Sequence, residues 1–511
     1  MNVDVQIYIM AFLSARDLST LMRTCRYFLD ACLLPLCVRS RALLSDSCSA
    51  RLRILPSFCR FLRINAGPSS REHLIKELWI TVHSMPTEDE KYFFDPRFIP
   101  IRKQWSNAFL DVLRHCHNVR RLRIDRWFLR DISYSLLMNT IGSSLNHLED
   151  LTIPTPYDTD INILRRFALL PLRSITFLKY SHRHTNFHVT SVSLEGLPRS
   201  LMELDIHGCT PVDTPFPQVR KLAIRDTTSE TFVADATAAF PNLTHLVLRH
   251  NSRLHYQHDG PPSRPLLDDA RTRNKIQWDS QGCEAWPSLS SIWVHDSFTL
   301  YSLGLSKRVS CLSISLDTGR HGKEAPYVAP VLADTSPSLL ELRINMDRSI
   351  SIPAGWHSHF GPSAASVLRL TLLLQVDSES SVTDKQRMIN MLETINAMLP
   401  AFTSLTHLLV RFVPVRRPYG INVSKKATRG TIQNYLRIFA GANMSLRWVG
   451  YEIHPFGLKC WDILRAGPGG RARRLEGLEL IELSNVSGLA VVNTERMREF
   501  KDVKPYLTVL S

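Results

Sequence analysis

Apolar residues near the N-terminus recur at the spacing of two short amphipathic helices. The first series has apolar residues at i, i+4, i+7 and i+8, namely Val5, Ile9, Phe12 and Leu13. The second series begins four residues after Ser14 and consists of Leu18, Leu21, Met22 and Cys25. Ser14 and Asp17 have the spacing of a capping box, which opens a helix. The pattern predicts two helices joined by a tight turn over residues 3–28.

A different pattern recurs beyond residue 70. It consists of Ser or Asn, an aliphatic residue, two variable positions, an aliphatic, one variable position and an apolar residue. Seven strict copies occur: NVRRLRI from Asn118, SLMELDI from Ser200, NLTHLVL from Asn242, SLSSIWV from Ser288, SLLELRI from Ser338, SLTHLLV from Ser404 and SLRWVGY from Ser445. About one such match is expected by chance, so the chain contains an internal repeat. Looser copies begin at Leu148, Leu172, Val219, Val309, Val367 and Leu475.

Each copy predicts a short parallel strand whose aliphatic residues point inward, because parallel strands need crossover connections of the length seen here. Helix-like segments lie between copies, beginning at Lys103, Asp384 and Thr431. Three polar or proline-containing stretches are expected to be inserted loops, at 84–101, 249–285 and 413–430.

The predicted fold class is therefore α/β, with a small helical module followed by an irregular repeat solenoid. We place the helical module at residues 1–45, a helical connector at 46–73 and the solenoid at 74–511. The open alternative is a generic α/β protein with aliphatic strands.

Both patterns resemble known families. The repeated phrase is similar to the leucine-rich repeat core L-x-x-L-x-L, although the Asn that follows the strand in that family is mostly absent. Residues 1–45 resemble an F-box of the fungal type: Asp4-Val5, Ile9 with Phe12-Leu13, Asp17-Leu18 and Cys25-Arg26 with Phe28 stand at that family's motif positions. Where the family opens with Leu-Pro, this chain has Met1-Asn2, which implies a weaker opening contact.

The F-box resemblance implies docking onto the Skp-type adaptor of a cullin-RING ubiquitin ligase. The residues it assigns to adaptor binding are Val5, Ile9, Phe12, Leu13, Asp17, Leu18, Leu21 and Arg26. The alternative for this segment is an ordinary amphipathic hairpin at the edge of a helical domain.

A target protein would bind the repeats through side chains that flank the central aliphatic of each phrase, because these point away from the core. The candidates are Arg121, Arg123, Trp293, Arg343, Arg369 and Trp448. Trp293 and Trp448 have the most weight because exposed Trp frequently anchors an interface. Alternatively, either ring folds under a neighbouring loop. Charges of both signs alternate along this row, so it does not indicate a phosphate pocket.

Composition limits the function classes. The 511 residues are 44% hydrophobic and 21% charged, which is typical of a globular chain. The net charge of +15 would suit nucleic acid, but the charge is dispersed, which argues against that partner. No apolar run is long enough to cross a membrane, and the N-terminus does not resemble a secretory signal. Ten scattered cysteines without a C-x-x-C pair indicate reduced thiols, hence the cytoplasm, the nucleus or both.

We find no phosphate-binding, dinucleotide-binding, metalloprotease or hydrolase motif. The sequence predicts a protein that is not an enzyme and needs no metal or cofactor. The leading hypothesis is a substrate receptor of a Skp-cullin-F-box ubiquitin ligase, which would raise the local concentration of its target. The alternative is a repeat scaffold with a vestigial F-box and no ligase.

Overall fold

The computed structural model describes residues 39–44, 59, 74–82, 99–124, 133–154, 164–178, 194, 196–206, 215–224, 232–249, 263–280, 286–317, 325–346, 360–376, 384–414, 425–453, 457–464 and 479–482. The chain forms two compact units. The first comprises residues 1–222 and 238–241, and the second comprises 223–237 and 242–511. Within the described ranges, no helix combines the length and apolarity that a membrane span requires. The helices predicted for residues 3–28 lie outside these ranges.

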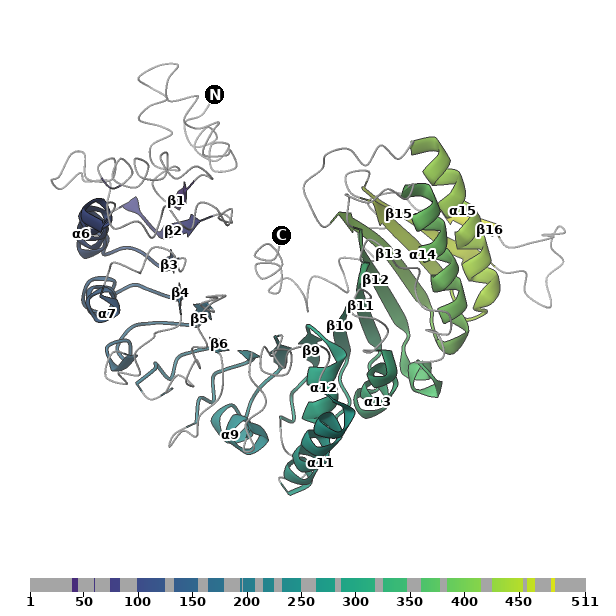
Figure 1. The fold of residues 1–511 in the computed structure, drawn as a ribbon, viewed down its shortest axis with the longest axis horizontal. Helices are drawn as coiled ribbons and strands as arrows, with labels where there is room; N and C mark the ends of the chain where they lie inside the picture. The colour runs from purple at the N-terminus through teal and green to yellow at the C-terminus, as the bar shows by residue number, and fades with distance from the viewer. Residues whose placement is uncertain are drawn as a thin grey trace, which may run out of the picture. The chain divides into compact units, whose positions relative to one another are not determined.

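Parallel strands in sequence order form the first unit. They are β1 (Arg39–Leu44), β2 (Glu77–Val82), β3 (Arg121–Ile124), β4 (Asp150–Pro154), β5 (Ser174–Leu178) and β6 (Glu203–Ile206). Helices α6 (Ile99–His115) and α7 (Tyr134–Ser144) connect consecutive strands and lie on the same side of them (Figure 1). The division between the units falls within β7 (Lys221–Ile224).

The second unit continues the same scheme. Its strands are β8 (His245–Leu248), β9 (Ser291–Val294), β10 (Cys311–Asp317), β11 (Leu339–Met346), β12 (Arg369–Val376), β13 (His407–Pro414), β14 (Trp448–Ile453), β15 (Gly457–Leu464) and β16 (Glu479–Glu482). Its helices are α9 (Phe232–Ala239, whose last two residues belong to the first unit), α11 (Arg264–Ser280), α12 (Ser297–Leu303), α13 (Ala325–Thr335), α14 (Asp384–Met398) and α15 (Lys425–Ala442), with short 3-10 helices η6 (Pro362–Ser366) and η7 (Leu399–Ala401).

A doubly accepting carbonyl marks the start of most strands. The oxygen of Lys76 accepts hydrogen bonds from the backbone N–H groups of both Arg120 and Arg121, at 2.8 and 3.0 Å. The same arrangement recurs at the carbonyls of Arg120, Glu149, Arg173, Met202, Thr244, Ser290, Ser338, Leu368 and Thr406. In each case the accepting residue directly precedes one strand, and the two donating N–H groups lie at the start of the neighbouring strand. These bonds therefore fix neighbouring strands in one register.

Side-chain hydroxyls reinforce this edge in the second unit. The hydroxyl of Ser310 donates to the Ser290 carbonyl at 2.8 Å, and that of Ser338 donates to the Ser310 carbonyl at 2.9 Å. Ser290 and Thr406 make the equivalent bonds to Thr244 and Leu368. The frequent Ser or Thr just before a strand therefore has a structural role, since it satisfies backbone acceptors at the sheet edge.

The core of the second unit lies between the sheet and its helices. Aliphatic residues at alternate strand positions are fully buried on that side, as at Ile292, Leu312, Leu340, Leu370 and Leu408. Apart from Leu340, these are the central aliphatics that the repeated phrase predicts to point inward. The repeat of parallel strands is confirmed, as are the three helices expected from Lys103, Asp384 and Thr431.

Several expectations are corrected. The stretch 249–285, expected to be a loop, contains the helix α11, and 413–430 contains the start of α15. The strands are not all parallel, because β14 with β15 and β15 with β16 pair antiparallel. Strand β1 occupies the end of the range 1–45 that we expected to be helical.

We predict that Leu340→Ala lowers the free energy of unfolding by about 2–5 kcal/mol, because it leaves a cavity at a fully buried position. Urea denaturation followed by circular dichroism measures this. Ile276→Ala in the same unit is the control, since Ile276 is 65% exposed and its truncation should change stability by about 0.5 kcal/mol or less. Equal effects of the two variants would contradict the assigned core.

Candidate functional site: the open face of the sheet

Each strand presents a second set of side chains on the side opposite the buried aliphatics, which we call the open face. In β3 the alternation is visible in the burial of successive residues, with Arg121 exposed, Leu122 buried, Arg123 half-buried and Ile124 buried. Strand geometry places alternate side chains on opposite faces, so register aligns the open-face residues into rows. All six candidate target-binding residues lie at open-face positions.

In the first unit, the open face carries a ladder of cross-strand ion pairs. Arg121 on β3 lies between two acids: its Nη1 is 3.3 Å from Glu77 Oε1 on β2, and its Nε is 2.9 Å from Asp150 Oδ2 on β4. The Arg121 side chain is still 56% exposed. The guanidinium of Arg123 lies 5.9 Å from the centre of the Trp79 ring. Glu77, Arg121 and Asp150 are therefore paired across neighbouring strands. Because Arg121 remains exposed, a partner protein can reach this part of the open face.

Asp150 has a perturbed acidity. Burial raises the pKa of its carboxyl above the ordinary value of 3.8, Arg121 opposes this shift, and the nearby charges of Glu149 and Glu77 add to it. Because burial outweighs the ion pair with Arg121, Asp150 carries its negative charge at a cost to the fold.

In the second unit, the open face holds a buried group that we call the Trp293 cluster: Trp293, Ser313, Glu341 and Arg343. Glu341 Oε1 accepts hydrogen bonds from Ser313 Oγ at 3.2 Å and from Arg343 Nε at 2.9 Å. The Arg343 guanidinium lies 5.4 Å from the centre of the Trp293 ring. These four residues are at most 7% exposed, and Trp293 also belongs to an apolar cluster with Ala223 and Val247.

Trp448 lies in an equally enclosed place. A Cβ atom at Gly450 would come within 2.7 Å of Trp448 Cη2 and 3.2 Å of Leu409 Cδ1, so the indole covers a position where only glycine fits. The His407 ring lies 5.9 Å away, centre to centre, on the neighbouring strand.

The structure corrects one expectation about these two residues. Trp293 and Trp448 were expected to be exposed anchors, and each is only 5% exposed. The register pairs Trp293 with the small Ser313, and the Trp448 indole lies against Gly450. Arg343 is buried and Arg369 is half-buried, so Arg121 is the one exposed member of the predicted set. The role of the set in target binding stays a prediction. The predicted adaptor-binding residues, Val5 to Arg26, lie outside the described ranges.

The copy of the repeated phrase that begins at Ser338 is out of step with the copies on the neighbouring strands. Its central aliphatic, Leu342, lies two residues beyond the residue that pairs with their central aliphatics. The register pairs Leu312 with Leu340, so Leu340 and not Leu342 aligns with the central aliphatics of β9 and β10. Glu341 and Arg343 still reach the open face, because side chains alternate with a period of two and a shift of two preserves the face.

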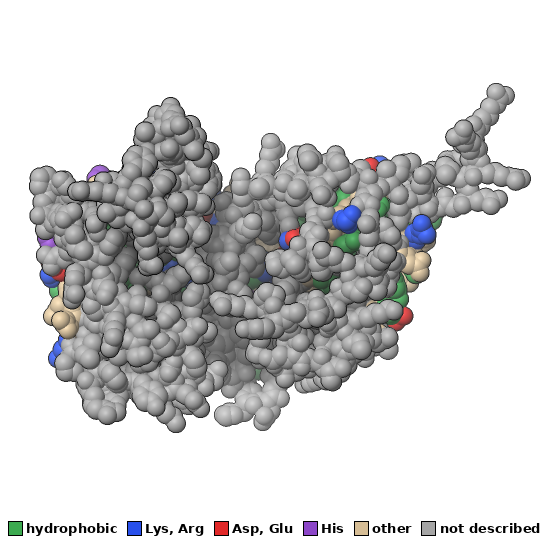
Figure 2. Space-filling view, turned by 90° about the horizontal axis from the view of Figure 1, so that it is seen from above, with side chains coloured by type: hydrophobic (Ala, Val, Ile, Leu, Met, Phe, Trp, Pro, Cys, Tyr) green, Lys and Arg blue, Asp and Glu red, His purple; other side chains and the backbone are tan. Residues whose placement is uncertain are grey.

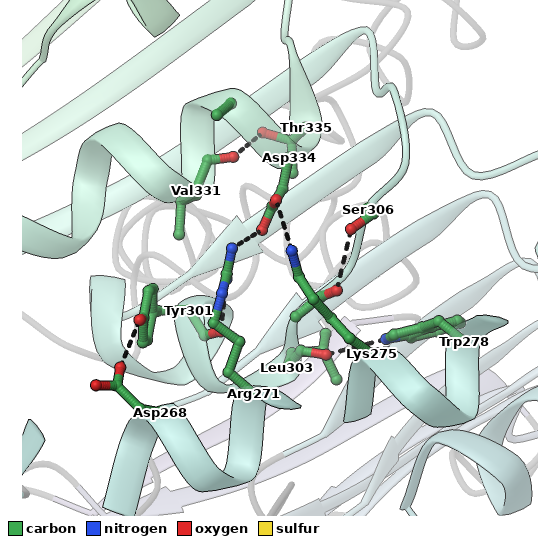
Figure 3. Close-up of polar contacts among 12 residues, drawn as sticks. Asp268, Arg271, Lys275, Trp278, Tyr301, Leu303, Ser306, Val331, Asp334 and Thr335 are labelled. Carbon is green, nitrogen blue, oxygen red and sulfur yellow. Dashed lines mark hydrogen bonds and ion pairs between the residues drawn. The ribbon is translucent and has the colours of Figure 1, made fainter. Parts of the chain in front are cut away.

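Sequence reasoning missed a polar network on the helix side, where α11, α12 and α13 meet (Figure 3). Arg271 donates to the Tyr301 carbonyl at 3.0 Å and to Asp334 at 2.5 Å, and Lys275 donates to the other oxygen of Asp334 at 3.3 Å. The Tyr301 hydroxyl donates to Asp268 at 2.6 Å. The signal in the sequence was faint, since the buried side of α11 consists of Leu267, Asn274 and Trp278, and only two of these are apolar.

Basic side chains and cysteines are also found among the described residues. Lys and Arg side chains are scattered over the described residues visible in Figure 2. Within the described ranges, no group of three or more His, Cys, Asp or Glu residues could hold a metal ion. Four cysteines in the described ranges are buried and form no disulfide with one another: Cys59, Cys116, Cys311 and Cys460. Burial raises the pKa of Cys59 and of Cys460 to about 12.

Asp334→Asn is expected to lower the free energy of unfolding by about 1–3 kcal/mol, because it leaves the largely buried Arg271 without its carboxylate. The double variant Arg271→Met, Asp334→Leu should recover much of this loss, since replacing both partners leaves no buried charge unpaired. Denaturant unfolding of both variants provides the measurement. A double variant less stable than the single one would contradict this account.

Asp150→Asn should stabilise the fold increasingly as pH rises. The raised pKa means that the stability contributed by protonated Asp150 is present below pH 3.8 and is lost as pH rises through the higher folded-state value. Asparagine keeps the neutral form at every pH. Unfolding measurements from about pH 3.5 to about pH 7 should show the two proteins diverging, in favour of the variant. A difference that stays constant or favours the native protein would refute the prediction.

Comparisons with known proteins give distant likenesses among solved structures. No protein-family model matches the chain, and no curated protein matches it. One similar solved structure is the crystal structure of the leucine-rich repeat-containing protein LegL7 from Legionella pneumophila, at 12% identity and a TM-score of 0.38, covering 78% of this chain and 98% of that one.

Proposed function

We propose that this chain is a non-enzymatic substrate receptor, which binds a target protein on the open face of its sheet and docks onto a Skp-type adaptor and cullin through its F-box-like N-terminus. The observation that carries target binding is the ion-pair ladder of Glu77, Arg121 and Asp150. It presents exposed and half-exposed charges of both signs on the side of the sheet away from α6 and α7. Mixed charge of this kind favours a specific protein partner over a polyanion.

Paired charge also separates this function from nucleic-acid binding. A phosphate backbone is neutralised by Lys and Arg side chains, and an arginine already paired with acids has less charge to offer it. In the ladder, Arg121 contacts two acids. Outside the ladder, the neighbouring Arg120 is also paired, with its Nη1 3.4 Å from Glu149 Oε1. The docking half of the proposal rests on the resemblance of residues 3–28 to an F-box. The second candidate is a scaffold that binds its partner in the same way without a ligase.

One affinity purification from cells tests both halves. The intact chain is expected to recover the adaptor, the cullin and one or more target proteins. Leu18→Asp, Leu21→Asp should lose the adaptor and cullin while keeping the target, because acidic residues disrupt an apolar docking surface. A purification of the intact chain that contains a target but no adaptor would favour the scaffold.

Arg121→Gln tests the open face in the same experiment. It should weaken target recovery by about fivefold, the effect of removing about 1 kcal/mol of binding free energy, and leave the adaptor in place. Arg114→Gln is the matched control, since Arg114 is an exposed arginine on α6 in the same unit. Equal losses for the two variants would speak against target binding by the open face.

A further inference from the structure

The Trp293 cluster contains a buried donor without an acceptor. The indole Nε1 of Trp293 is inaccessible to solvent and has no hydrogen-bond partner in the described part of the chain. Leaving such a donor unpaired costs about 1–3 kcal/mol, so a native fold usually supplies a partner for it. A missing partner at a position that faces away from the core is a reason to look for a ligand.

Two further groups in the cluster are available to a ligand. Arg343 uses its Nε for Glu341, and among the described residues its two terminal nitrogens donate to no acceptor. Glu341 accepts both of its hydrogen bonds at Oε1, so its Oε2 is open as an acceptor within the same ranges. The cluster thus has several donors and one acceptor on neighbouring strands, and the Arg343 guanidinium lies over the Trp293 ring, 5.4 Å from its centre.

The charge of the cluster limits what can bind. Arg343 and Glu341 neutralise each other across 2.9 Å, and their side chains are only 9% and 6% exposed. A carboxylate or phosphate would add an uncompensated charge to this buried pair, which is costly. A neutral group with one acceptor and one donor avoids that cost. A carboxamide has both: its oxygen can accept from Trp293 or Arg343 while its NH2 group donates to Glu341.

We infer that the Trp293 cluster is a subsite for the side-chain amide of an Asn or Gln in the target protein. This inference rests on the proposed binding of a protein to the open face, and it names the chemistry that one part of that face recognises. A side chain suits the site better than a main-chain amide, because β9 to β12 are hydrogen-bonded to strands on both sides and offer no free edge for an added strand.

The test is selection of displayed random peptides on the intact chain, followed by affinity measurement of the selected peptides. Clones should share an Asn or Gln, and replacing that residue by Leu should weaken binding by about tenfold, as expected for lost buried hydrogen bonds. Trp293→Phe, which keeps the packing and removes the N–H, should weaken the same clones. Leu169→Ala, at a 96% exposed position, is the control that should leave them unchanged.

Glu341→Gln provides a readout that a merely structural role would not give. With Glu341 neutral, the Arg343 charge is no longer compensated, so peptides selected on this variant should carry Asp or Glu in place of Asn or Gln. Thermal unfolding by circular dichroism checks that each variant is folded. Even if Trp293→Phe fails to fold, this change of preference tests the inference alone.

Other outcomes overturn the inference. Peptides selected on the intact chain that favour acidic or phosphorylated residues would refute the amide assignment, as would clones with no shared residue, which is the result expected if water alone satisfies Trp293. Clones that bind through Arg121 and are insensitive to Trp293→Phe would refute the subsite and leave the proposed function standing. A complete lack of binding clones would count against both.

Discussion

The doubly accepting carbonyls at the strand starts are the constraint from which the other features follow. Each one ties two consecutive N–H groups of the next strand to a single oxygen, so a strand cannot slide along its neighbour without breaking both bonds. Within each unit, a fixed register in turn keeps the aliphatic residues in one layer under the helices and the variable residues in rows on the open face. Both the core and the candidate site therefore depend on bonds that involve no variable side chain.

The regular part of this arrangement could be predicted from the sequence, because alternation and repetition are local properties. Aliphatic residues such as Leu122 and Leu312 recur at a fixed position in their phrases, and their strands and inward orientation follow directly. Helix α11 could not be predicted in this way. Its buried side relies on Asn274 and on the contacts of Arg271 and Lys275 with Asp334, which lie far along the chain.

The open face shows where local reasoning ends. Sequence alternation placed Trp293 and Trp448 on the correct side of the sheet, but their exposure depends on their neighbours across the strands. The Trp448 indole lies against Gly450, and the register pairs Trp293 with Ser313, but neither neighbour is visible in a single phrase. The open-face charges also differ in exposure: Arg121 in the first unit is 56% exposed, whereas Glu341 and Arg343 in the second unit are enclosed.

The displacement of the Ser338 phrase by two residues has an evolutionary consequence. Because strand side chains alternate with a period of two, a strand boundary can move by two residues without exchanging the core and surface faces. A change of one residue would turn Leu340 and Leu342 outward and bury Glu341 against the helices instead. A repeat of this chain can therefore shift its strand by an even number of residues and keep its core, whereas an odd shift would expose the core residues. Strict motif spacing would be lost over time even though the architecture endures, and family resemblance would fade from the sequence first.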